Sequence, residues 1–322
     1  MIKIGLRRVK VRRRSKHIIA ILSITLAFTY LLLMMIIAGV YDPNKTILVA
    51  GGALKIPYNI EFINTLNTTL IIALLPSGIA YYINLRRKMN TEQNLPIFLR
   101  DLAELVRTGI PLTKAIEELS FKDYGALTPL LKRLALRMMF GEDLGRAVEE
   151  VFKGESPITR KLSLMVAEAY YSGGRAAEVL RTASNFALIL QRFNDERRRE
   201  LKVYGVIVYM AIIVYLIVSA ILLYMNMSMY TSPGVVIGGG RFAIAFIPPW
   251  HIKAVLYYAS IILMITCAIV LSKVYYGVFG PGLLHASILL LVVMVYFTFI
   301  DAVITILTGV QVGIQPKPPI TP

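Results

Sequence analysis

Five long apolar segments, separated by polar ones, make up most of the chain. A helix that crosses the roughly 30 Å hydrocarbon core of a bilayer needs about 20 mostly apolar residues. The pattern therefore predicts five membrane spans, at residues 18–40, 66–83, 203–224, 254–272 and 286–307. The second span contains Pro76, which predicts a kink in that helix.

The longest polar segment, residues 85–202, shows helical spacing and no strand pattern. Its prolines and glycines stand where helices are expected to begin and end. We expect Pro96 in the first turn of a helix that ends at Gly109, and Pro111 at the start of the next. Further start and stop signals are Thr128 before Pro129, Asp143, Ser156 before Pro157, and the pair Gly173 and Gly174. These signals predict six helices.

The sixth of these helices carries an apolar seam with a 4-3-4-3 spacing, which predicts packing against another helix. The seam consists of Val179, Ala183, Phe186, Leu190 and Phe193. No helix-breaking residue follows it before the third apolar segment. We therefore expect one uninterrupted helix that passes through Arg197, Arg198 and Arg199 into the third span.

A repeat of 32 residues relates parts of this polar segment. Gly109, Gly141 and Gly173 are evenly spaced, and the five residues Leu112, Ala115, Ile116, Glu117 and Glu118 match Leu144, Ala147, Val148, Glu149 and Glu150 at the same offset. The third copy is much weaker. Equal spacing predicts three helical hairpins around one core, and favours this bundle over a solenoid, in which three units would be almost all caps.

Basic residues set the expected orientation, since cytoplasmic loops of membrane proteins are enriched in Lys and Arg. Residues 1–16 hold eight bases and no acid, and residues 85–202 hold 21 bases and 16 acids. The segments 41–64 and 225–253 hold two bases each. We therefore expect the N-terminus and residues 85–202 in the cytoplasm and the C-terminus outside. The expected parts are residues 1–84 with two spans, 85–202 as the cytoplasmic bundle, and 203–322 with three spans, an outer loop and a tail.

Composition agrees with a membrane protein, because 57% of the 322 residues are apolar and only 17% are charged. The net charge of +16 raises the question of a nucleic-acid partner. The basic N-terminus directly precedes a span, however, which favours a topology signal in contact with anionic lipid. The expected fold class is an all-α polytopic membrane protein with five transmembrane helices and one cytoplasmic six-helix bundle.

No catalytic, cofactor or metal site is predicted. His17, His251 and His285 lie apart near expected membrane boundaries, and no phosphate-binding Gly-rich loop occurs. The run 238–240 of three glycines is compatible with an outer hairpin turn or with a plain loop. Asp301 is the one acid well inside a span. It is compatible with a polar contact to a partner helix, with a helix-packing hydrogen bond or with an interfacial position.

Residues 95–112, LPIFLRDLAELVRTGIPL, resemble the opening of the F-family domain of type II secretion and type IV pilus platform proteins. Further motifs follow in the family's order: 115–119 (AIEEL), 141–144 (GEDL), and Ala147 with Val148. Ser156 with Pro157, 169–174 (AYYSGG) and 178–180 (EVL) resemble the archaeal branch more closely, and so do residues 277–286. The resemblance covers roughly residues 90–307 and is carried by Pro96, Gly109, Pro111, Gly141, Pro157, Gly173 and Gly174.

The resemblance implies a plasma-membrane assembly platform that is not an enzyme. In this family a separate hexameric cytosolic ATPase docks on the helical domain, and pilin-like subunits pass from the bilayer into a filament. Long members have two such domains, and this chain has one, as in the Tad-C proteins, which implies a second copy or a paralogous subunit. Where bacterial members carry Gly-Glu-x-x-Gly, this chain has Gly173-Gly174-Arg175, so the role of that Glu is not transferred.

Two kinds of charged residue are candidate contacts to the ATPase, although solvated helix faces explain both as well. They are the acids Glu117, Glu118, Glu149 and Glu150 and the bases Arg197, Arg198 and Arg199. The alternative function is the membrane subunit of a transporter energised by a separate ATPase. A permease is expected to line its path with polar residues, and an enzyme to hold an acid–base pair, neither of which stands out in this sequence.

Overall fold

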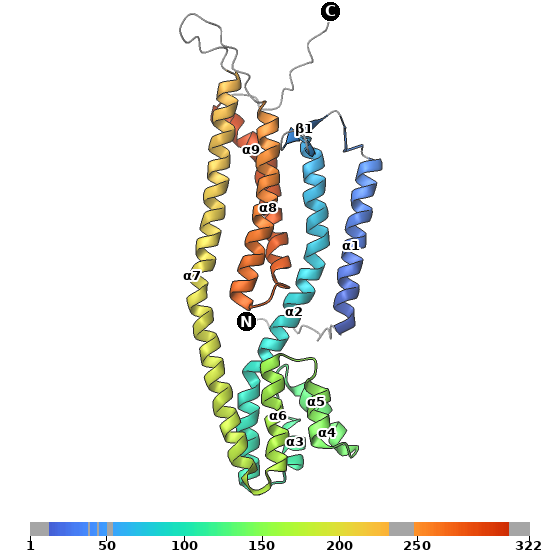
Figure 1. Cartoon of the computed structure of the whole chain (residues 1–322), viewed down its shortest axis with the longest axis vertical. Helices are drawn as coiled ribbons and strands as arrows, with labels where there is room; N and C mark the ends of the chain where they lie inside the picture. The colour runs from blue at the N-terminus through green and yellow to red at the C-terminus, as the bar shows by residue number, and fades with distance from the viewer. Residues whose placement is uncertain (1–12, 38, 44, 50–53, 232–247, 309–322) are drawn as a thin grey trace, which may run out of the picture. The chain divides into compact units, whose positions relative to one another are not determined.

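The computed structural model describes residues 13–37, 39–43, 45–49, 54–231 and 248–308. These residues form helices and one small antiparallel sheet (Figure 1). The strands are β1 (Thr46–Val49) and β2 (Leu54–Pro57). The helices are α1 (Arg13–Ile36), α2 (Ile60–Arg107), α3 (Leu112–Leu119), α4 (Thr128–Met139), α5 (Leu144–Phe152), α6 (Pro157–Tyr171), the short 3-10 helix η1 (Gly173–Arg175), α7 (Ala176–Thr231), α8 (Pro249–Tyr276) and α9 (Gly282–Thr308).

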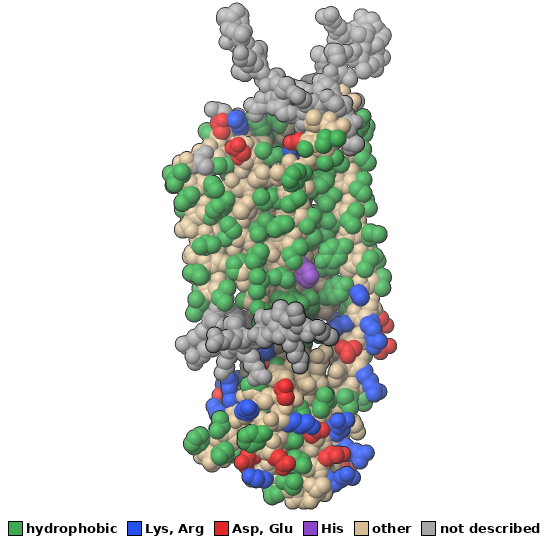
Figure 2. Space-filling model, turned by 180° about the vertical axis from the view of Figure 1, so that it is seen from behind, with side chains coloured by type: hydrophobic (Ala, Val, Ile, Leu, Met, Phe, Trp, Pro, Cys, Tyr) green, Lys and Arg blue, Asp and Glu red, His purple; other side chains and the backbone are tan. Residues whose placement is uncertain are grey.

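The described chain folds as two compact units. Residues 81–202 form the first, which we call the helical bundle, and residues 14–80 together with 203–308 form the second, which we call the membrane unit. The long helices α2 and α7 contribute to both units. Charged side chains gather on the bundle, whereas hydrophobic side chains dominate the visible face of the membrane unit (Figure 2).

Five helices of the described chain are long and apolar enough to cross a membrane: α1, α2, α7, α8 and α9. The expected number of spans is therefore confirmed, and the protein is an all-α polytopic membrane protein. Most helices exceed the expected spans, since α8 begins at Pro249 and ends at Tyr276, where Gly277 adopts a left-handed backbone with φ of 70°. The first helix instead ends early, at Ile36.

The expected helix start at Pro96 is wrong, because Pro96 lies inside α2, which runs for 48 residues through both Pro76 and Pro96. A proline inside a helix removes one backbone hydrogen bond and crowds the carbonyl four residues earlier. The residues just before Pro96 include Arg, Lys, Met, Glu and Gln, which have high helix propensity. Tertiary packing of the following residues then keeps the helix continuous.

The β1–β2 hairpin was missed by the sequence analysis. Thr46 pairs with Pro57 and Val49 pairs with Leu54 in an antiparallel register. Both strand sequences, TILV and LKIP, are rich in β-branched and aliphatic residues, and a Gly-Gly pair lies between them. This pattern is a usable hairpin signal. The alternative hairpin at residues 238–240 lies outside the described residues, as does the basic N-terminal stretch up to residue 12.

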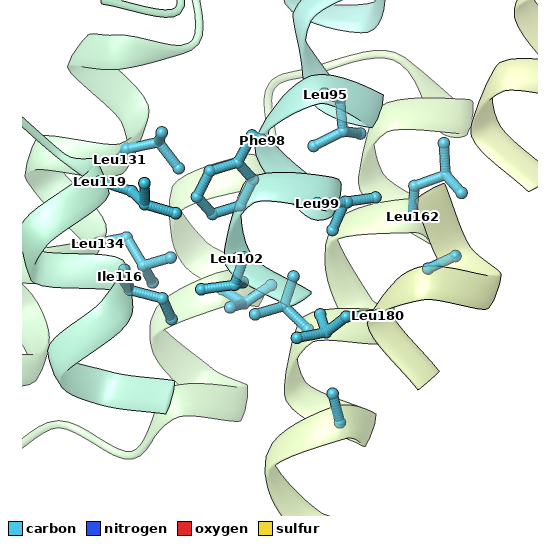
Figure 3. Close-up of a cluster of buried hydrophobic side chains, with 14 of the residues drawn as sticks. Leu95, Phe98, Leu99, Leu102, Ile116, Leu119, Leu131, Leu134, Leu162 and Leu180 are labelled. Carbon is cyan, nitrogen blue, oxygen red and sulfur yellow. The ribbon is translucent and has the colours of Figure 1, made fainter. Parts of the chain in front are cut away.

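One apolar core holds the helical bundle together, with buried side chains from α2, α3, α4, α5, α6 and α7 (Figure 3). The six-helix count is therefore confirmed for this unit, to which α2 and α7 each contribute only the part that lies within residues 81–202. The core repeats every 32 residues, and equivalent positions in the three copies are almost fully buried. Such triplets are Leu95, Leu127 and Thr159; Phe98, Leu130 and Leu162; Leu99, Leu131 and Ser163; Leu102, Leu134 and Val166; and Leu112, Leu144 and Ala176.

The third repeat closes on the first. Ser184 in α7 donates its hydroxyl to the carbonyl oxygen of Pro96 in α2, at 2.8 Å, and both groups are buried. A cavity lined by α2, α6 and α7 lies in the same region, and its walls include Leu95, Leu162 and Ala187. The three hairpins thus form a closed bundle around one core, in agreement with the interpretation of the repeat.

The seam expected on the sixth helix is partly wrong. Ala183 of that seam is buried, but Phe186 is 51% exposed and Phe193 is 64% exposed. The core instead receives the small side chains of Ala183, Ser184 and Ala187. The hydrogen bond from Ser184 to Pro96 thus lies on the face of α7 that carries these small side chains, and this face packs on α2.

Candidate functional site

Glycine turns define one end of the helical bundle. Gly109, Gly141 and Gly173 have φ of 92°, 81° and 59°, a region that favours glycine. The first two turns share the same pattern, since Ile110 N bonds Leu105 O and Glu142 N bonds Arg137 O, each at a spacing of five residues. This is the Schellman geometry that ends a helix. The third turn enters η1 instead, which fits its weaker sequence match.

The predicted helix caps are confirmed at two positions. Asp143 accepts hydrogen bonds from the backbone N of Gly145 and of Arg146, and Ser156 accepts one from Thr159 N, with Pro157 in the first turn of α6. At Pro111 the backbone turns into α3 without a side-chain cap.

The cap expected at Thr128 is wrong. Leu127 occupies the N-cap position of α4, and the Thr128 hydroxyl accepts a hydrogen bond from Tyr124 N in the preceding turn at 2.7 Å. A threonine hydroxyl can accept a hydrogen bond from a backbone N–H of the helix or of the preceding turn, and here it accepts the one from the turn.

The acidic candidates lie at equivalent positions of two repeats, on α3 and on α5. Glu118, Glu149 and Glu150 are exposed, and the Glu117 side chain is 35% exposed. Glu117 forms an ion pair with Lys114 at 2.9 Å, and Glu150 forms one with Lys153 at 3.3 Å. Both pairs join neighbours on one helix face, so they do not tie the helices to each other.

The basic candidates on α7 differ in exposure. Arg197 and Arg199 are exposed, whereas Arg198 is partly buried and lines the cavity between α2, α6 and α7 together with Glu92 and Asp195. Arg198 therefore packs within the bundle, whereas Arg197 and Arg199 expose their positive charges on the surface of α7.

A tyrosine connects two neighbouring glycine turns. The Tyr171 hydroxyl donates to the Asp143 carboxylate, at 3.0 Å from Oδ1 and 2.9 Å from Oδ2. This hydrogen bond, followed by the one from Arg146 N, lowers the pKa of Asp143 below its usual value. The same contact raises the pKa of Tyr171. The second and third turns of the bundle are thereby joined at its glycine-turn end.

A second polar cluster fixes the loop between α3 and α4. Asp101 in α2 accepts hydrogen bonds from the Tyr124 hydroxyl at 2.8 Å and from Lys122 Nζ at 2.6 Å. Burial, and then the bond to Asp101, raise the pKa of Tyr124. Sequence reasoning missed this cluster because no local motif links Asp101 to residues more than 20 positions away.

In the membrane unit, Asp301 lies next to a base. Its Oδ2 is 2.5 Å from Lys253 Nζ, in an ion pair between α9 and the start of α8. The Lys253 side chain is 10% exposed and the Asp301 side chain 41% exposed. Of the alternatives given for Asp301 from the sequence, this contact matches the helix-packing hydrogen bond, and the base that donates it is Lys253.

The membrane unit also contains a buried polar network that sequence reasoning missed. Asn67 in α2 is fully buried, and its Nδ2 donates to the Tyr257 hydroxyl at 3.2 Å and to the Leu290 carbonyl at 3.1 Å. Tyr257 donates in turn to Asn64 Oδ1 at 2.8 Å and stacks on Phe297 with ring centres 4.5 Å apart. Three helices, α2, α8 and α9, are thus joined by one side chain. An asparagine within an apolar span is the available signal.

Among the residues that the structure describes, no group of three His, Cys, Asp or Glu side chains is arranged to hold a metal ion. The arrangement of polar groups joins helices and turns to each other.

Residues 98–224 match the family model of type II secretion system protein F. They include nearly all of the bundle core and the apolar part of α7. This part of the chain is therefore similar to the F domain of the type II secretion system. This finding confirms the resemblance that the motifs from Pro96 to Gly174 indicated.

An uncharacterized protein of Methanocaldococcus jannaschii is 25% identical to this chain over 156 residues. The alignment covers 48% of this chain and only 26% of that protein. The chain thus spans about a quarter of the length of the relative that it matches. No solved structure matches the chain significantly.

Proposed function

We propose that this protein is the membrane platform of a type IV pilus-like or secretion machine. The observation that carries the proposal is the F-domain match at residues 98–224, which joins a helical bundle to a membrane helix in one family unit. The bundle docks a separate hexameric cytosolic ATPase, and the membrane unit receives pilin-like subunits and guides them into a filament. The platform itself catalyses nothing.

In this proposal the bundle lies in the cytoplasm and the C-terminus lies outside, as the distribution of Lys and Arg favours. Labelling of single cysteines tests the orientation, in a variant in which Cys267, the one cysteine of the chain, is replaced by Ser. A maleimide that cannot cross membranes should label Asp42→Cys in intact cells and should label Asn185→Cys only after lysis. Labelling of Asn185→Cys in intact cells would reverse the orientation and remove the docking proposal with it.

Work by the ATPase reaches the bilayer, in this proposal, through α7. This helix runs for 56 residues without a break, from Ala176 in the bundle to Thr231 in the membrane unit. A ligand shifts a conformational equilibrium only when it binds the two states unequally. We therefore propose that the ATPase prefers one tilt or rotation of α7, and that the helix passes this preference to the pilin-binding helices.

A flexible insertion tests this coupling. Four Gly-Ser residues placed after Glu200 should abolish filament assembly while leaving ATPase binding intact, measured by filament counts in cells and by co-purification. The control is the same insertion after Gly154, which has open space around it. Normal filaments from the Glu200 insertion would exclude rigid coupling.

Deletion of the gene tests the function as a whole. Loss of filaments, together with co-purification of a secretion-type ATPase and a pilin-like subunit, is the expected result. Intact filaments together with loss of solute uptake would favour the alternative, a transporter subunit.

The family resemblance further supports pairing with a second copy or with a paralogous platform subunit, because residues 98–224 match one F domain and long members of the family have two. It also leads us to propose contact between the basic N-terminal residues and anionic lipid. Cross-linking in native membranes tests the pairing, and a chain that stays a monomer in the assembled machine would exclude it.

A further inference from the structure

The exposed face of α4 differs from the equivalent faces of the other two repeats. Leu136 is 53% exposed, Met139 is 70% exposed and Phe140, directly after the helix, is 88% exposed. At the equivalent positions the first repeat has the exposed residues Glu104, Arg107 and Thr108. The third repeat has Glu168, Tyr171 and Ser172 there.

The three repeats bury the same core positions, so they serve as internal controls for each other. Two of them fold with polar or amphipathic residues where α4 has large apolar ones. The apolar residues of α4 are therefore not a requirement of the hairpin, and an exposed cluster of this kind is a feature of binding surfaces.

Positive charge borders this cluster. α4 contains three bases and no acid. Arg137 forms an ion pair with Glu142 at 2.8 Å. Lys132 and Arg133 are exposed and form no ion pair within the part of the chain that the structure describes. Residues spaced by three, four and seven positions share one helix face, so Lys132, Leu136 and Met139 lie together, with Arg133 and Phe140 beside them. We call these five residues the α4 patch.

The position of the patch favours a protein over a bilayer as its partner. In Figure 3, Leu131 lies beside Phe98 and Leu134 beside Leu102, so α4 runs in the same direction as this part of α2. The end of α4 therefore lies at the glycine-turn end of the bundle, where α2 ends. The opposite end of the bundle carries Arg86, Arg87 and Lys88, next to the apolar part of α2. The 22 residues from Arg86 to Arg107 extend for roughly 30 Å.

We propose that the α4 patch is the surface that docks the cytosolic ATPase, through an apolar contact on the partner that is edged with carboxylates. The inference rests on the proposed function, because it takes the ATPase as the partner. Met and Phe fill the centre of protein interfaces well, and a few central side chains carry most of the binding energy. Lys132 and Arg133 speed the encounter and select an acidic partner surface.

The test uses the full-length protein in lipid nanodiscs and the secretion-type ATPase of the same organism. The triple variant Leu136→Glu, Met139→Arg, Phe140→Thr places the residues of the first repeat on α4 and leaves the net charge unchanged. We expect it to weaken ATPase binding by about tenfold or more. Lys132→Gln with Arg133→Gln should weaken binding less and reduce its dependence on salt.

The matched control is Phe121→Asn. Phe121 is 78% exposed, and the third repeat has the exposed Asn185 at the equivalent position, so this change removes an equally exposed ring outside the patch. It should bind the ATPase like the wild type. The single variant Phe140→Thr covers the case of a misfolded triple variant, because a side chain 88% exposed contributes little to the core.

The outcomes separate this inference from the function it rests on. Binding by the wild type together with equal binding by the folded triple variant, or by Phe140→Thr if the triple variant misfolds, would overturn the α4 patch and leave the platform function standing. No binding by the wild type would overturn both. Loss of attachment to vesicles of anionic lipid, with ATPase binding unchanged, would show that the patch meets a membrane and would also overturn the proposal.

Discussion

The helical bundle and the membrane unit use different kinds of contact to hold their helices. In the bundle, large apolar side chains such as Phe98, Leu131 and Phe152 are fully or almost fully buried, because water drives them into the core. In the membrane unit, large apolar residues such as Leu22 and Ile213 remain exposed on the helices, at 67% and 51%.

Lipid tails are as apolar as leucine, so burying leucine between helices in a bilayer gains little from the hydrophobic effect. The membrane unit has an apolar cluster of its own, which includes Leu290 and Phe297. In addition, hydrogen bonds, as at Asn67, and close approach of backbones, as at Gly78, join its helices. The surrounding solvent thus decides which residues carry the packing, and variants of each kind can break or sharpen this comparison.

The largest effect is expected at Gly78. A Cβ added there would lie 2.4 Å from the backbone N of Leu284 in α9, and backbone atoms cannot move aside as a flexible side chain does. Gly78→Ala should therefore separate α2 from α9 and cost more than the ~1–3 kcal/mol that is typical of overpacking. Thermal unfolding of the detergent-solubilised protein measures it. Gly154→Ala, with no atom near the added Cβ, is the control, and equal melting of the two variants would contradict the prediction.

The bundle core should respond next most strongly. Leu102 is fully buried between the repeats, and Leu102→Ala removes apolar contacts and leaves a cavity, at a cost of about 2–5 kcal/mol. Amide hydrogen exchange of the full-length protein localises the loss of stability to residues 81–202. The control Phe140→Ala, at an exposed position, should change the stability by about 0.5 kcal/mol or less. Protection that is unchanged in Leu102→Ala would mean that the hydrophobic core does not govern the bundle.

A smaller effect is expected at Asn67. Asn67→Leu removes the hydrogen bonds that join α2 to Tyr257 in α8 and to Leu290 in α9, whereas Tyr257 keeps its bond to Asn64. Hydrogen bonds between membrane helices contribute about 0.5–2 kcal/mol, so the variant should unfold at a moderately lower temperature. Thr69→Val removes a hydroxyl that bonds the carbonyl of Thr65 in the same helix, so this variant should show a smaller effect. A more stable Asn67→Leu protein would show that apolar burial, and not hydrogen bonding, stabilises the membrane unit as it does the bundle.

The smallest effect is expected from Tyr171→Phe, and it depends on pH. The hydrogen bond from Tyr171 holds the folded-state pKa of Asp143 below its unfolded value, so the bond stabilises the bundle above that unfolded pKa. This contribution is lost as the pH falls through the lowered, folded-state pKa. The variant should therefore be slightly less stable than the wild type near neutral pH, and the two should converge in acid. A difference in melting temperature that stays constant from neutral to acidic pH would show that Asp143 is not involved.

Local signals in the sequence predicted much of this fold. The five spans follow from the length of the apolar segments. Asp143 and Ser156 stand directly before helix-forming segments, and their side chains cap the helices that begin there. The glycine turns follow from the left-handed backbone that Gly109 and Gly141 adopt at low cost.

Tertiary contacts decided the rest. Pro96 looked like a helix start, yet packing of Leu95 and Phe98 in the core continues the helix through it. Phe186 and Phe193 looked like core residues, yet α7 turns the face with Ala183, Ser184 and Ala187 toward the core and leaves both rings exposed. The partners of Asn67 lie 190 and 223 positions away along the chain, and local spacing carries no information at that range.

The candidate surfaces were predicted less well than the fold. The acidic pairs on α3 and α5 are visible in the repeat, because two adjacent Glu residues recur after 32 positions. The residues of the α4 patch are equally visible in the sequence. An apolar residue on a helix is, however, interpreted as a core residue until its exposure is known. Only the comparison of equivalent positions in the three repeats separates the two cases.

The bond between Ser184 and Pro96 also limits how this domain can evolve. Repeat proteins with open ends can lengthen by tandem duplication, since each new copy docks on a free edge. Here the last hairpin already covers the edge of the first, so a fourth copy would find nowhere to pack. Growth of this fold would therefore require association of whole chains, or duplication of the entire domain.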